Sequence, residues 1–487
     1  MYRFTGVSRL LLAAGSAAFL ASCAVMGPDP QVALRQADQA MGGANLKTLR
    51  YAATGTGGTF GQAWVPGQAW PRLNITSFSR VLDYESGAMR EDSARARSEP
   101  NGGGAVPLMG QGEQRVSGFV RGTHAWNMVG PAPVAAPVAL DARIHDLWTT
   151  PHGVVKAAMK NAAMARSDGG RTVVSFSQPG RFKATAWIGS DGLVERVDSV
   201  HPHPVSGDTA VTTFYSGYRD WGNGVRFPTR IQQTQGGSPV YDLNVSEVQA
   251  NVPTPAPEVP ALVSGFVERP VSEKVADGVW HIAGGSHNSV LIEMADHLIL
   301  VESPLYDGRA LAVIAEARRL VPGKPIRYAI NSHHHFDHSG GLRAAASEGI
   351  TLVTSELARP YFERTLANPN SINPDALQRS GRRATVMGVA GMREFRDATR
   401  QVVVYPIDNS VHAQGFQMVW LPKERLLIEA DAFTPGAPNA APPNPPNANH
   451  VNLIENIQRR GLNVDRILPL HGRVVPYAEL RRTAGMR

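Results

Sequence analysis

A single cysteine, Cys23, stands in this sequence of 487 residues, and that scarcity restricts its chemistry. One thiol cannot form an intramolecular disulfide, and it cannot build a zinc site from thiolates. Long apolar runs are also missing. None reaches the roughly 18 residues of a membrane-spanning helix, which excludes a polytopic membrane protein. The 48 glycines and 36 prolines follow no Gly-x-y repeat, so they exclude a collagen-like chain and instead favour many turns and strands.

Basic and acidic residues nearly balance in this chain. The 48 basic residues outnumber the 41 acidic ones, giving a net charge of +7, and no dense basic stripe concentrates them. A nucleic-acid partner is therefore not expected. Hydrophobic residues make up 43% of the chain and charged residues 18%, which is enough for a packed core, and the length favours two to three domains.

Residues 1–22 have the pattern of a bacterial lipoprotein signal peptide. Arg3 and Arg9 form a basic start, residues 10–20 are apolar but too short to span a bilayer, and small residues precede Cys23. In such signals the cysteine becomes the lipidated first residue of the mature chain. The pattern predicts a lipid-anchored protein on the periplasmic side of the bacterial cell envelope. An ordinary signal peptide, which would leave the protein soluble in the periplasm, is the alternative.

Residues 23–250 are predicted to form a mostly antiparallel β domain. Short runs alternate polar and apolar side chains, and Ser190, Asp191 and Gly192 mark a hairpin turn between two of them. Strands are expected at 171–176, 184–188, 193–197, 209–215 and 241–245, and helices near 30–41 and 152–165. The segment 221–231 resembles the late strands of periplasmic lipoprotein carrier proteins, which implies a curved half-barrel over a lipid-binding cavity.

Residues 251–264 include a proline-rich stretch, which we interpret as a linker. Residues 265–487 then alternate strand-like and helix-like segments, and this alternation predicts an α/β domain whose strands are covered by helices. Strands are expected at 289–293, 297–302, 326–330, 351–354, 401–406, 417–421 and 425–429, and helices at 308–320 and 340–348.

Four histidines and an aspartate crowd the segment 333–338, which reads His-His-His-Phe-Asp-His. The segment follows an apolar strand and precedes a helix that Gly340 and Gly341 open. Substrate sites of open α/β sheets lie at the carboxyl ends of strands, and neutral imidazole and carboxylate are ligands that zinc accepts without thiolates. The candidate metal ligands are His333, His335, Asp337 and His338.

This His-x-His-x-Asp-His pattern resembles the metallo-β-lactamase superfamily, over about residues 265–487. In that superfamily the pattern is followed by a third histidine, an aspartate and a final histidine, each at the end of a later strand. The matching residues here are His412, Asp431 and His471. The sequence around His412 is Val-His-Ala, whereas the family usually has Gly-His-Thr. The resemblance implies an αββα sandwich of the α/β class, preceded by the mostly antiparallel β domain.

The resemblance also implies a pair of zinc ions. The first would be held by His333, His335 and His412, and the second by Asp337, His338 and His471, with Asp431 bridging them. A water shared by two cations has a pKa near 7, so a metal-bridging hydroxide could attack the substrate at neutral pH. Asp337 would orient that nucleophile and is the candidate catalytic residue. The implied function is hydrolysis of a small-molecule ester, thioester, lactone or amide, with β-lactams included.

Other residues of this domain are given supporting roles. His334 is expected to point away from the metals, and Glu302 stands where the family often has an aspartate that braces the ligand loop. Histidines expected to be structural or solvated are His281, His287, His297 and His450, although the loop that carries His287 can border the active site.

Two alternatives remain open at this point. One is a lipid- or lipoprotein-binding envelope protein whose metal domain is structural or regulatory. The other keeps the fold but replaces zinc with iron. Flavodiiron relatives have a glutamate where His335 stands, which favours zinc, whereas sulfur dioxygenases retain the histidine.

Overall fold

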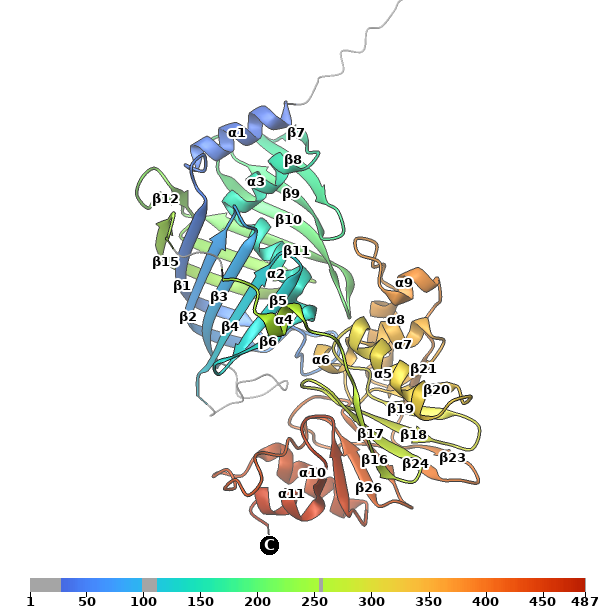
Figure 1. The fold of residues 1–487 in the computed structure, drawn as a ribbon. Helices are drawn as coiled ribbons and strands as arrows, with labels where there is room; N and C mark the ends of the chain where they lie inside the picture. Colours follow the sequence, from blue (N-terminus) through green and yellow to red (C-terminus); the bar gives the residue numbers. More distant parts are fainter. Residues whose placement is uncertain (1–27, 99–111, 254–256, 487) are drawn as a thin grey trace, which may run out of the picture.

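The computed structural model describes residues 28–98, 112–253 and 257–486, and these form two parts joined near residues 251–264 (Figure 1). Residues 1–22 and Cys23 lie outside the described residues, so the lipid anchor stays a prediction. Within the described ranges, no helix is both long enough and apolar enough to cross a membrane.

The first part is built on one sheet of thirteen strands, in the order β6-β5-β4-β3-β2-β1-β15-β14-β11-β10-β9-β8-β7. Its strands are β1 Thr48–Gly58, β2 Arg72–Asp83, β3 Ala88–Arg97, β4 Gln114–Arg121, β5 His124–Val129, β6 Ala132–Ala135, β7 Met164–Asp168, β8 Arg171–Gln178, β9 Phe182–Ile188, β10 Val194–His203, β11 Gly207–Ser216, β14 Arg230–Gln235 and β15 Ser238–Ala250. A small ribbon pairs β12 Arg219–Asp220 with β13 Arg226–Phe227. Every neighbouring pair in the large sheet is antiparallel, so the predicted mostly antiparallel β character is confirmed.

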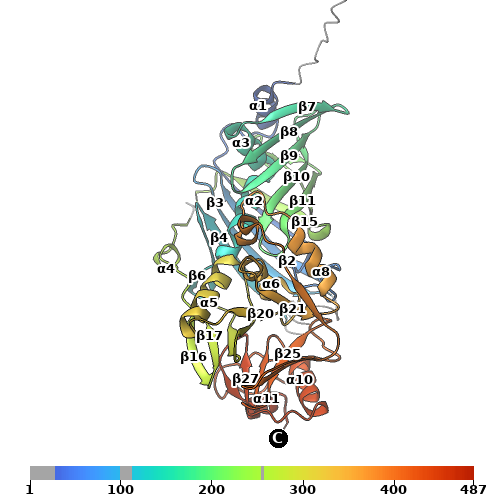
Figure 2. The same ribbon diagram turned by 90° about the vertical axis from the view of Figure 1, so that its right-hand side faces the viewer.

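Helices α2 Leu140–Trp148 and α3 Pro151–Lys160 lie within the curve of this sheet, with a 3-10 turn at Pro137–Ala139, and α1 Pro30–Ala40 lies at its upper end in the view of Figure 1, next to α3 (Figures 1 and 2). Leu34, Leu147 and Val154, one from each helix, are fully buried in the same apolar cluster as the inner side chains of the strands. The helix expected at 152–165 ends at Lys160, because Asn161 is already extended and β7 begins three residues later. Helix α2 was not expected from the sequence.

The second part is a sandwich of two sheets with helices on both outer faces. The first sheet, in sequence order, contains β16 Val271–Ala276, β17 Val279–Ala283, β18 Ser289–Glu293, β19 Leu298–Val301, β20 Ile326–Ile330, β21 Thr351–Ser355 and β22 Val386–Val389. The second contains β23 Arg393–Arg396, β24 Gln401–Pro406, β25 Gln417–Leu421, β26 Leu426–Glu429, β27 Arg466–Pro469 and β28 Val475–Pro476. The helices are α5 Asp307–Leu320, α6 Phe336–Ser339, α7 Leu342–Ser347, α8 Arg359–Ala367, α9 Ala376–Ser380, α10 Ala448–Arg459 and α11 Tyr477–Thr483.

The apolar runs of the strands are explained by burial on both faces of each sheet. In β18, Val290 and Ile292 join the cluster between the two sheets, while Leu291 between them faces helices α5 and α7. A strand covered on both faces carries a continuous apolar run instead of an alternating one. The expected α/β sandwich of αββα type is therefore the observed architecture.

The segment that joins the two parts is partly docked. Helix α4 Ala261–Ser264 follows the proline-rich stretch, and Val259 and Val263 pack against Phe119 and Trp126 of the first sheet. This end of the predicted linker 251–264 is therefore fixed to the first part.

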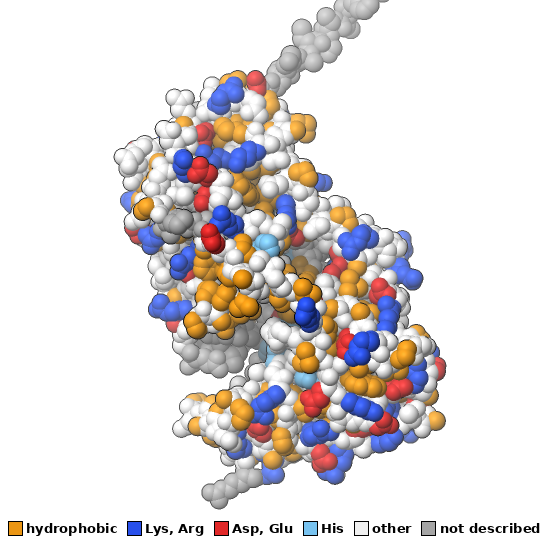
Figure 3. Space-filling view, viewed as in Figure 1, with side chains coloured by type: hydrophobic (Ala, Val, Ile, Leu, Met, Phe, Trp, Pro, Cys, Tyr) orange, Lys and Arg blue, Asp and Glu red, His pale blue; other side chains and the backbone are white. Residues whose placement is uncertain are grey.

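The two parts also meet directly, at the loop between β1 and β2 (residues 59–71) and at the hairpin between β10 and β11. The backbone N–H of Phe336 donates to the carbonyl oxygen of Gly61 at 3.2 Å, and the N–H of Asp208 donates to that of Pro369 at 2.7 Å. Figure 3 shows histidine side chains at a hollow where the two parts face each other.

Candidate metal centre

The turn with four histidines leaves the carboxyl end of β20 and enters the short helix α6. Its path depends on a close backbone approach at Gly340, where an added Cβ would lie only 1.8 Å from the carbonyl oxygen of Leu305. No other residue fits there, which explains the glycine that follows the histidine-rich segment. The turn is buried, with His335 and His338 both fully shielded from solvent.

Three of the predicted histidines converge in a first cluster. Nε2 of His333 lies 2.9 Å from Nδ1 of His335 and 3.0 Å from Nε2 of His412. Oδ2 of Asp431 completes the group, 2.8 Å from Nε2 of His412 and 3.5 Å from Nε2 of His333. The four residues come from the turn after β20, the β24–β25 connection and the loop after β26, so only the folded chain unites them.

A second cluster lies beside the first. Nε2 of His338 and Nε2 of His471 are 3.1 Å apart, and Oδ1 of Asp431 lies 3.1 Å from the former and 2.7 Å from the latter. Oδ2 of Asp337 faces this group, 3.8 Å from Nε2 of His338 and 3.2 Å from Nε2 of His287. Asp431 thus presents one carboxylate oxygen to each cluster.

Burial and mutual charge shape the titration of these groups. Burial, followed by the charge of His338, holds the pKa of His333 well below its usual range, and His335 is depressed in the same way by burial and by His333. Burial alone would raise the pKa of Asp431, but the imidazoles of His338 and His412 outweigh it and keep the carboxyl ionised. Burial opposes the charge of His338, yet Asp431 and Asp337 raise its pKa well above normal.

The chemistry of these donors fits divalent cations. The ligand atoms of each group of four, His333, His335, His412 and Asp431 on one side and His287, Asp337, His338 and His471 on the other, lie within 4.8 Å of one another. Imidazole nitrogens and carboxylate oxygens are a donor set that zinc accepts, and no thiolate takes part. The seven predicted ligands are all brought together.

Glu302 lies directly behind the clusters. Its carboxylate accepts hydrogen bonds from Oγ of Ser332 at 2.5 Å, Nδ2 of Asn331 at 3.0 Å and Nδ1 of His338 at 3.1 Å. The carboxylate is fully buried, so these three contacts replace its hydration. The longer side chain therefore reaches the ligand turn from the position where the family often has an aspartate.

The other histidines divide into two groups. His281 donates to the carbonyl oxygen of Pro469, His297 lies beside Asp296, and His450 packs edge-on against Phe433, all away from the clusters. His287 differs from its predicted structural or solvated role, because its ring lies within the second cluster. The only signal for this in the sequence was its place in the loop before β18.

Two residues of the N-terminal part reach the centre, and nothing in the sequence pointed to them. Nε2 of Gln62 donates to Oδ1 of Asp337 at 2.8 Å. The carbonyl oxygen of Ala63 accepts from Nε2 of His334 at 2.8 Å and from Nε2 of His335 at 2.9 Å. His334 therefore turns away from the clusters, as expected, but is buried against this loop.

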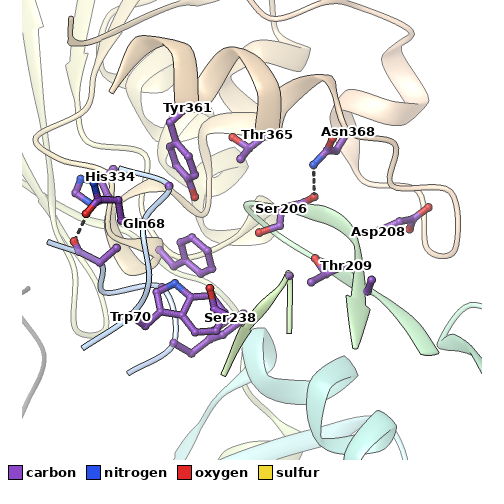
Figure 4. A pocket seen from close by; sticks show the side chains of 17 residues that line it. Gln68, Trp70, Ser206, Asp208, Thr209, Ser238, His334, Tyr361, Thr365 and Asn368 are labelled. Atoms are coloured by element: carbon purple, nitrogen blue, oxygen red, sulfur yellow. Dashed lines mark hydrogen bonds between the residues drawn. The ribbon is translucent and has the colours of Figure 1, made fainter. Parts of the chain in front are cut away.

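A cavity of about 250 Å³ lies next to the centre, between the two parts (Figure 4). Trp70 and Tyr361 supply aromatic walls from the β1–β2 loop and from α8, and His334 of the ligand turn also lines the cavity. Nδ2 of Asn368 donates to the carbonyl oxygen of Ser206 at 3.1 Å and ties the end of α8 to the β10–β11 hairpin.

Comparison with known proteins finds a family match over part of the chain. Residues 282–471 match the model of the metallo-beta-lactamase superfamily. A curated relative, the alpha subunit of 2,4-dinitroanisole O-demethylase from Nocardioides sp. (strain JS1661), is 25% identical over 210 residues, which is 43% of this chain and 58% of the relative. The match therefore spans less than two thirds of that relative's length.

Solved structures of metallo-beta-lactamases align with less than half of the chain. The enzyme from Pontibacter korlensis is 18% identical and covers 45% of this chain and 98% of its own, with a TM-score of 0.35. The enzyme from Hirschia baltica is 19% identical and covers 44% of this chain and 96% of its own, with a TM-score of 0.34.

Proposed function

We propose that the chain, whose residues 282–471 match the model of the metallo-beta-lactamase superfamily, is a dinuclear zinc hydrolase of small molecules. The superfamily match and the clustered donors support a metallo-hydrolase. The number and identity of the ions, and the bond cleaved, are our proposal.

One observation carries the dinuclear proposal, the position of Asp431. Its Oδ2 lies 2.8 Å from His412 in the first cluster, and its Oδ1 lies 2.7 Å from His471 in the second. A carboxylate with one oxygen in each group is suited to bridge two cations. If the site held a single ion, the imidazoles and carboxylates of the other cluster would be buried together without a cation to bind.

The chain's own residues set up the reaction. When bound, two divalent cations lower the pKa of a shared water towards neutrality and polarise the bond to be cleaved. Asp337 presents Oδ2 to the second cluster, where it can accept a hydrogen bond from the attacking water and take up its proton. Burial of His333, His335 and His338 excludes bulk water and strengthens every electrostatic contact in the site.

For the substrate we propose an ester, thioester, lactone or amide, with β-lactams included. The absence of any cysteine ligand supports the glyoxalase II-like and lactonase-like part of this range. The relative from Nocardioides is named for O-demethylation of 2,4-dinitroanisole, so an activated aryl ether belongs in the same substrate panel.

Metal analysis and a substrate panel test the proposal together. Wild-type protein should hold two zinc ions per chain and cleave at least one member of a panel of chromogenic ester, thioester, lactone, lactam and 2,4-dinitroanisole substrates. His335→Ala and His338→Ala should each lose zinc and activity, because each removes a donor from one cluster. His124→Ala, a change on the rim of the first sheet, is the matched control and should behave as wild type.

Three results would each overturn a part of the proposal. Unchanged metal content in both cluster variants would remove the metal assignment. Lipid that co-purifies with protein inactive on the whole panel would favour the alternative, lipid or lipoprotein binding. Iron in protein prepared without added metal would replace zinc as the resident ion.

We also propose that the mature chain is anchored to the periplasmic side of the cell envelope through lipid on Cys23. The basic start and the apolar residues 10–20 before a small-residue junction support this. Cys23→Ser should abolish incorporation of labelled fatty acid and move the protein out of the membrane fraction. Unchanged labelling would contradict the anchor.

A further inference from the structure

We propose that Gln62 and Ala63, on the β1–β2 loop of the N-terminal sheet, are positioning residues of the metal centre. Ala63 would fix which nitrogen of His335 faces the first ion, and Gln62 would fix which oxygen of Asp337 faces the second. The inference rests on the proposed dinuclear function and adds that the N-terminal domain completes the catalytic site.

The argument for Ala63 starts from the number of protons on an imidazole. A neutral histidine ring carries one N–H, and a carbonyl oxygen can only accept a hydrogen bond. Because Nε2 of His335 lies 2.9 Å from the carbonyl oxygen of Ala63, the proton belongs on Nε2. Nδ1 is then left with a free lone pair, and it is Nδ1 that lies 2.9 Å from Nε2 of His333 inside the first cluster. Metal-ligating histidines are oriented by such a partner on their outer nitrogen.

Gln62 plays the corresponding part for Asp337. A carboxylate can only accept, so the amide group of Gln62 presents its N–H to Oδ1, at 2.8 Å. Oδ2 is left facing His287 and His338, on the side of the second cluster. One neutral side chain thus holds the carboxylate in place without adding charge to the site.

The loop is itself held against the ligand turn. Gly61 has a φ of +74°, and an added Cβ would lie 2.3 Å from Cγ of Phe336, so only glycine permits this approach. Phe60 packs edge-on against Phe336 with ring centroids 5.1 Å apart, and the N–H of Gln414 donates to the carbonyl oxygen of Trp64 at 2.9 Å. The loop therefore has anchors on both sides of Gln62 and Ala63.

Two consecutive residues of the loop thus contact one ligand of each cluster: Gln62 contacts Asp337, and Ala63 contacts His335. A loop that only joined the two parts would not need hydrogen bonds to Nε2 of His335 and Oδ1 of Asp337. The same carbonyl oxygen also accepts from His334, so both of its lone pairs are used on the ligand turn.

Substitution of Gln62 by an apolar side chain of similar size tests the hydrogen bond to Asp337 while keeping the packing of the loop. Gln62→Met in the full chain removes the donor but keeps most of the volume, and Gln68→Met on the same loop is the matched control. Zinc affinity, measured by competition with a chromogenic chelator, should fall about 10–100-fold for one of the two ions in Gln62→Met and stay unchanged in Gln68→Met. The melting temperature of the metal-free protein should be the same in both variants.

The outcomes separate this inference from the proposed function. If wild-type protein binds no metal, both fail. If wild type binds two ions and Gln62→Met binds them equally tightly, or if its metal-free melting temperature drops while affinity is kept, only the positioning role fails. At saturating zinc, Gln62→Met should also have a lower kcat at unchanged KM, because Asp337 would no longer be held in place.

The Ala63 contact has its own measurement, because its carbonyl cannot be removed by substitution. Nitrogen NMR of the metal-free protein labelled at histidine should report the Nε2-protonated tautomer for His335, assigned by the signal lost in His335→Ala. Gly61→Ala, which forces the loop away from Phe336, should weaken that preference and lower zinc affinity. An Nδ1-protonated His335 in the wild-type protein would overturn the role of Ala63.

Discussion

Oε2 of Glu302 lies 3.1 Å from Nδ1 of His338, on the side of the ring opposite the second cluster. Glu302 also has a φ of +73°, a backbone conformation that side-chain-bearing residues rarely adopt. Such strain persists where the surrounding structure requires it, often at functional sites. Here the conformation directs a buried carboxylate at Ser332, Asn331 and His338 together.

Glu302→Gln should therefore weaken the second ion. The variant keeps the shape of the side chain but loses the negative charge that favours a proton on Nδ1 of His338, so Nε2 becomes a poorer ligand. We expect about a 10–100-fold loss of affinity for one zinc ion by chelator competition. Glu363→Gln, a similar change on the exposed face of α8, should leave affinity unchanged. Equal affinities in the two variants would contradict the bracing role.

The ligand turn could be predicted from the sequence because its donors are adjacent in the chain. His333, His335, Asp337 and His338 are close in space whatever the rest of the fold does, and the later ligands follow from their order after successive strands. Gln62 lies far away in the sequence, on a loop of another sheet. Its contact with Asp337 depends on how two domains pack, and no local pattern encodes that packing.

The fold shows the same division. Alternation of polar and apolar residues predicted antiparallel strands in residues 23–250, since that pattern is a local property of each strand. It could not predict that thirteen strands join into one sheet, or that α2 lies inside it. Helix α2 contains only residues Leu140–Trp148, and its buried face packs against strands from distant parts of the sequence.

His287→Gln should decide whether His287 is a metal ligand of the second cluster or only a hydrogen-bond partner of Asp337. Nε2 of His287 lies 3.2 Å from Oδ2 of Asp337, and glutamine can still donate to that oxygen. We expect the variant to keep two zinc ions, with the affinity of one lowered about tenfold at most. His338→Gln, measured beside it, should lose an ion. Loss of an ion in both variants would make His287 a ligand.

Arg80 should be essential to the stability of the first part. Its buried guanidinium contacts Oε2 of Glu91 and Oδ2 of Asp146, each at 2.6 Å. Arg80→Met would leave two partly buried carboxylates without their counter-charge, at a cost of about 3–5 kcal/mol in the free energy of unfolding. Arg90→Met removes an exposed pair with Asp92 and should cost less than about 1 kcal/mol. Urea unfolding followed by tryptophan fluorescence measures both, and similar midpoints would contradict the prediction.

The first part should also lose stability in mild acid because of His152. Burial is the main cause that lowers the pKa of His152 to about 4, and its Nε2 donates to the carbonyl oxygen of Met41. In the unfolded chain the pKa is about 6.5, so between pH 6.5 and 4 the unfolded state binds more protons. Stability is therefore complete above pH 6.5 and declines as the pH falls, by about 2 kcal/mol at pH 5 from this residue alone.

Thermal melting of metal-free protein at pH 7.5 and pH 5.0 measures the acid sensitivity of the whole chain, to which the buried histidines of the ligand turn also contribute. The comparison between variants isolates the share of His152. His152→Gln cannot take up the proton, so its melting temperature should fall less between the two pH values than that of the wild type. His124→Gln, at a partly exposed position, should keep the wild-type difference because it leaves buried His152 in place. If His152→Gln and the wild type lose equal amounts, buried His152 is not a source of the acid sensitivity.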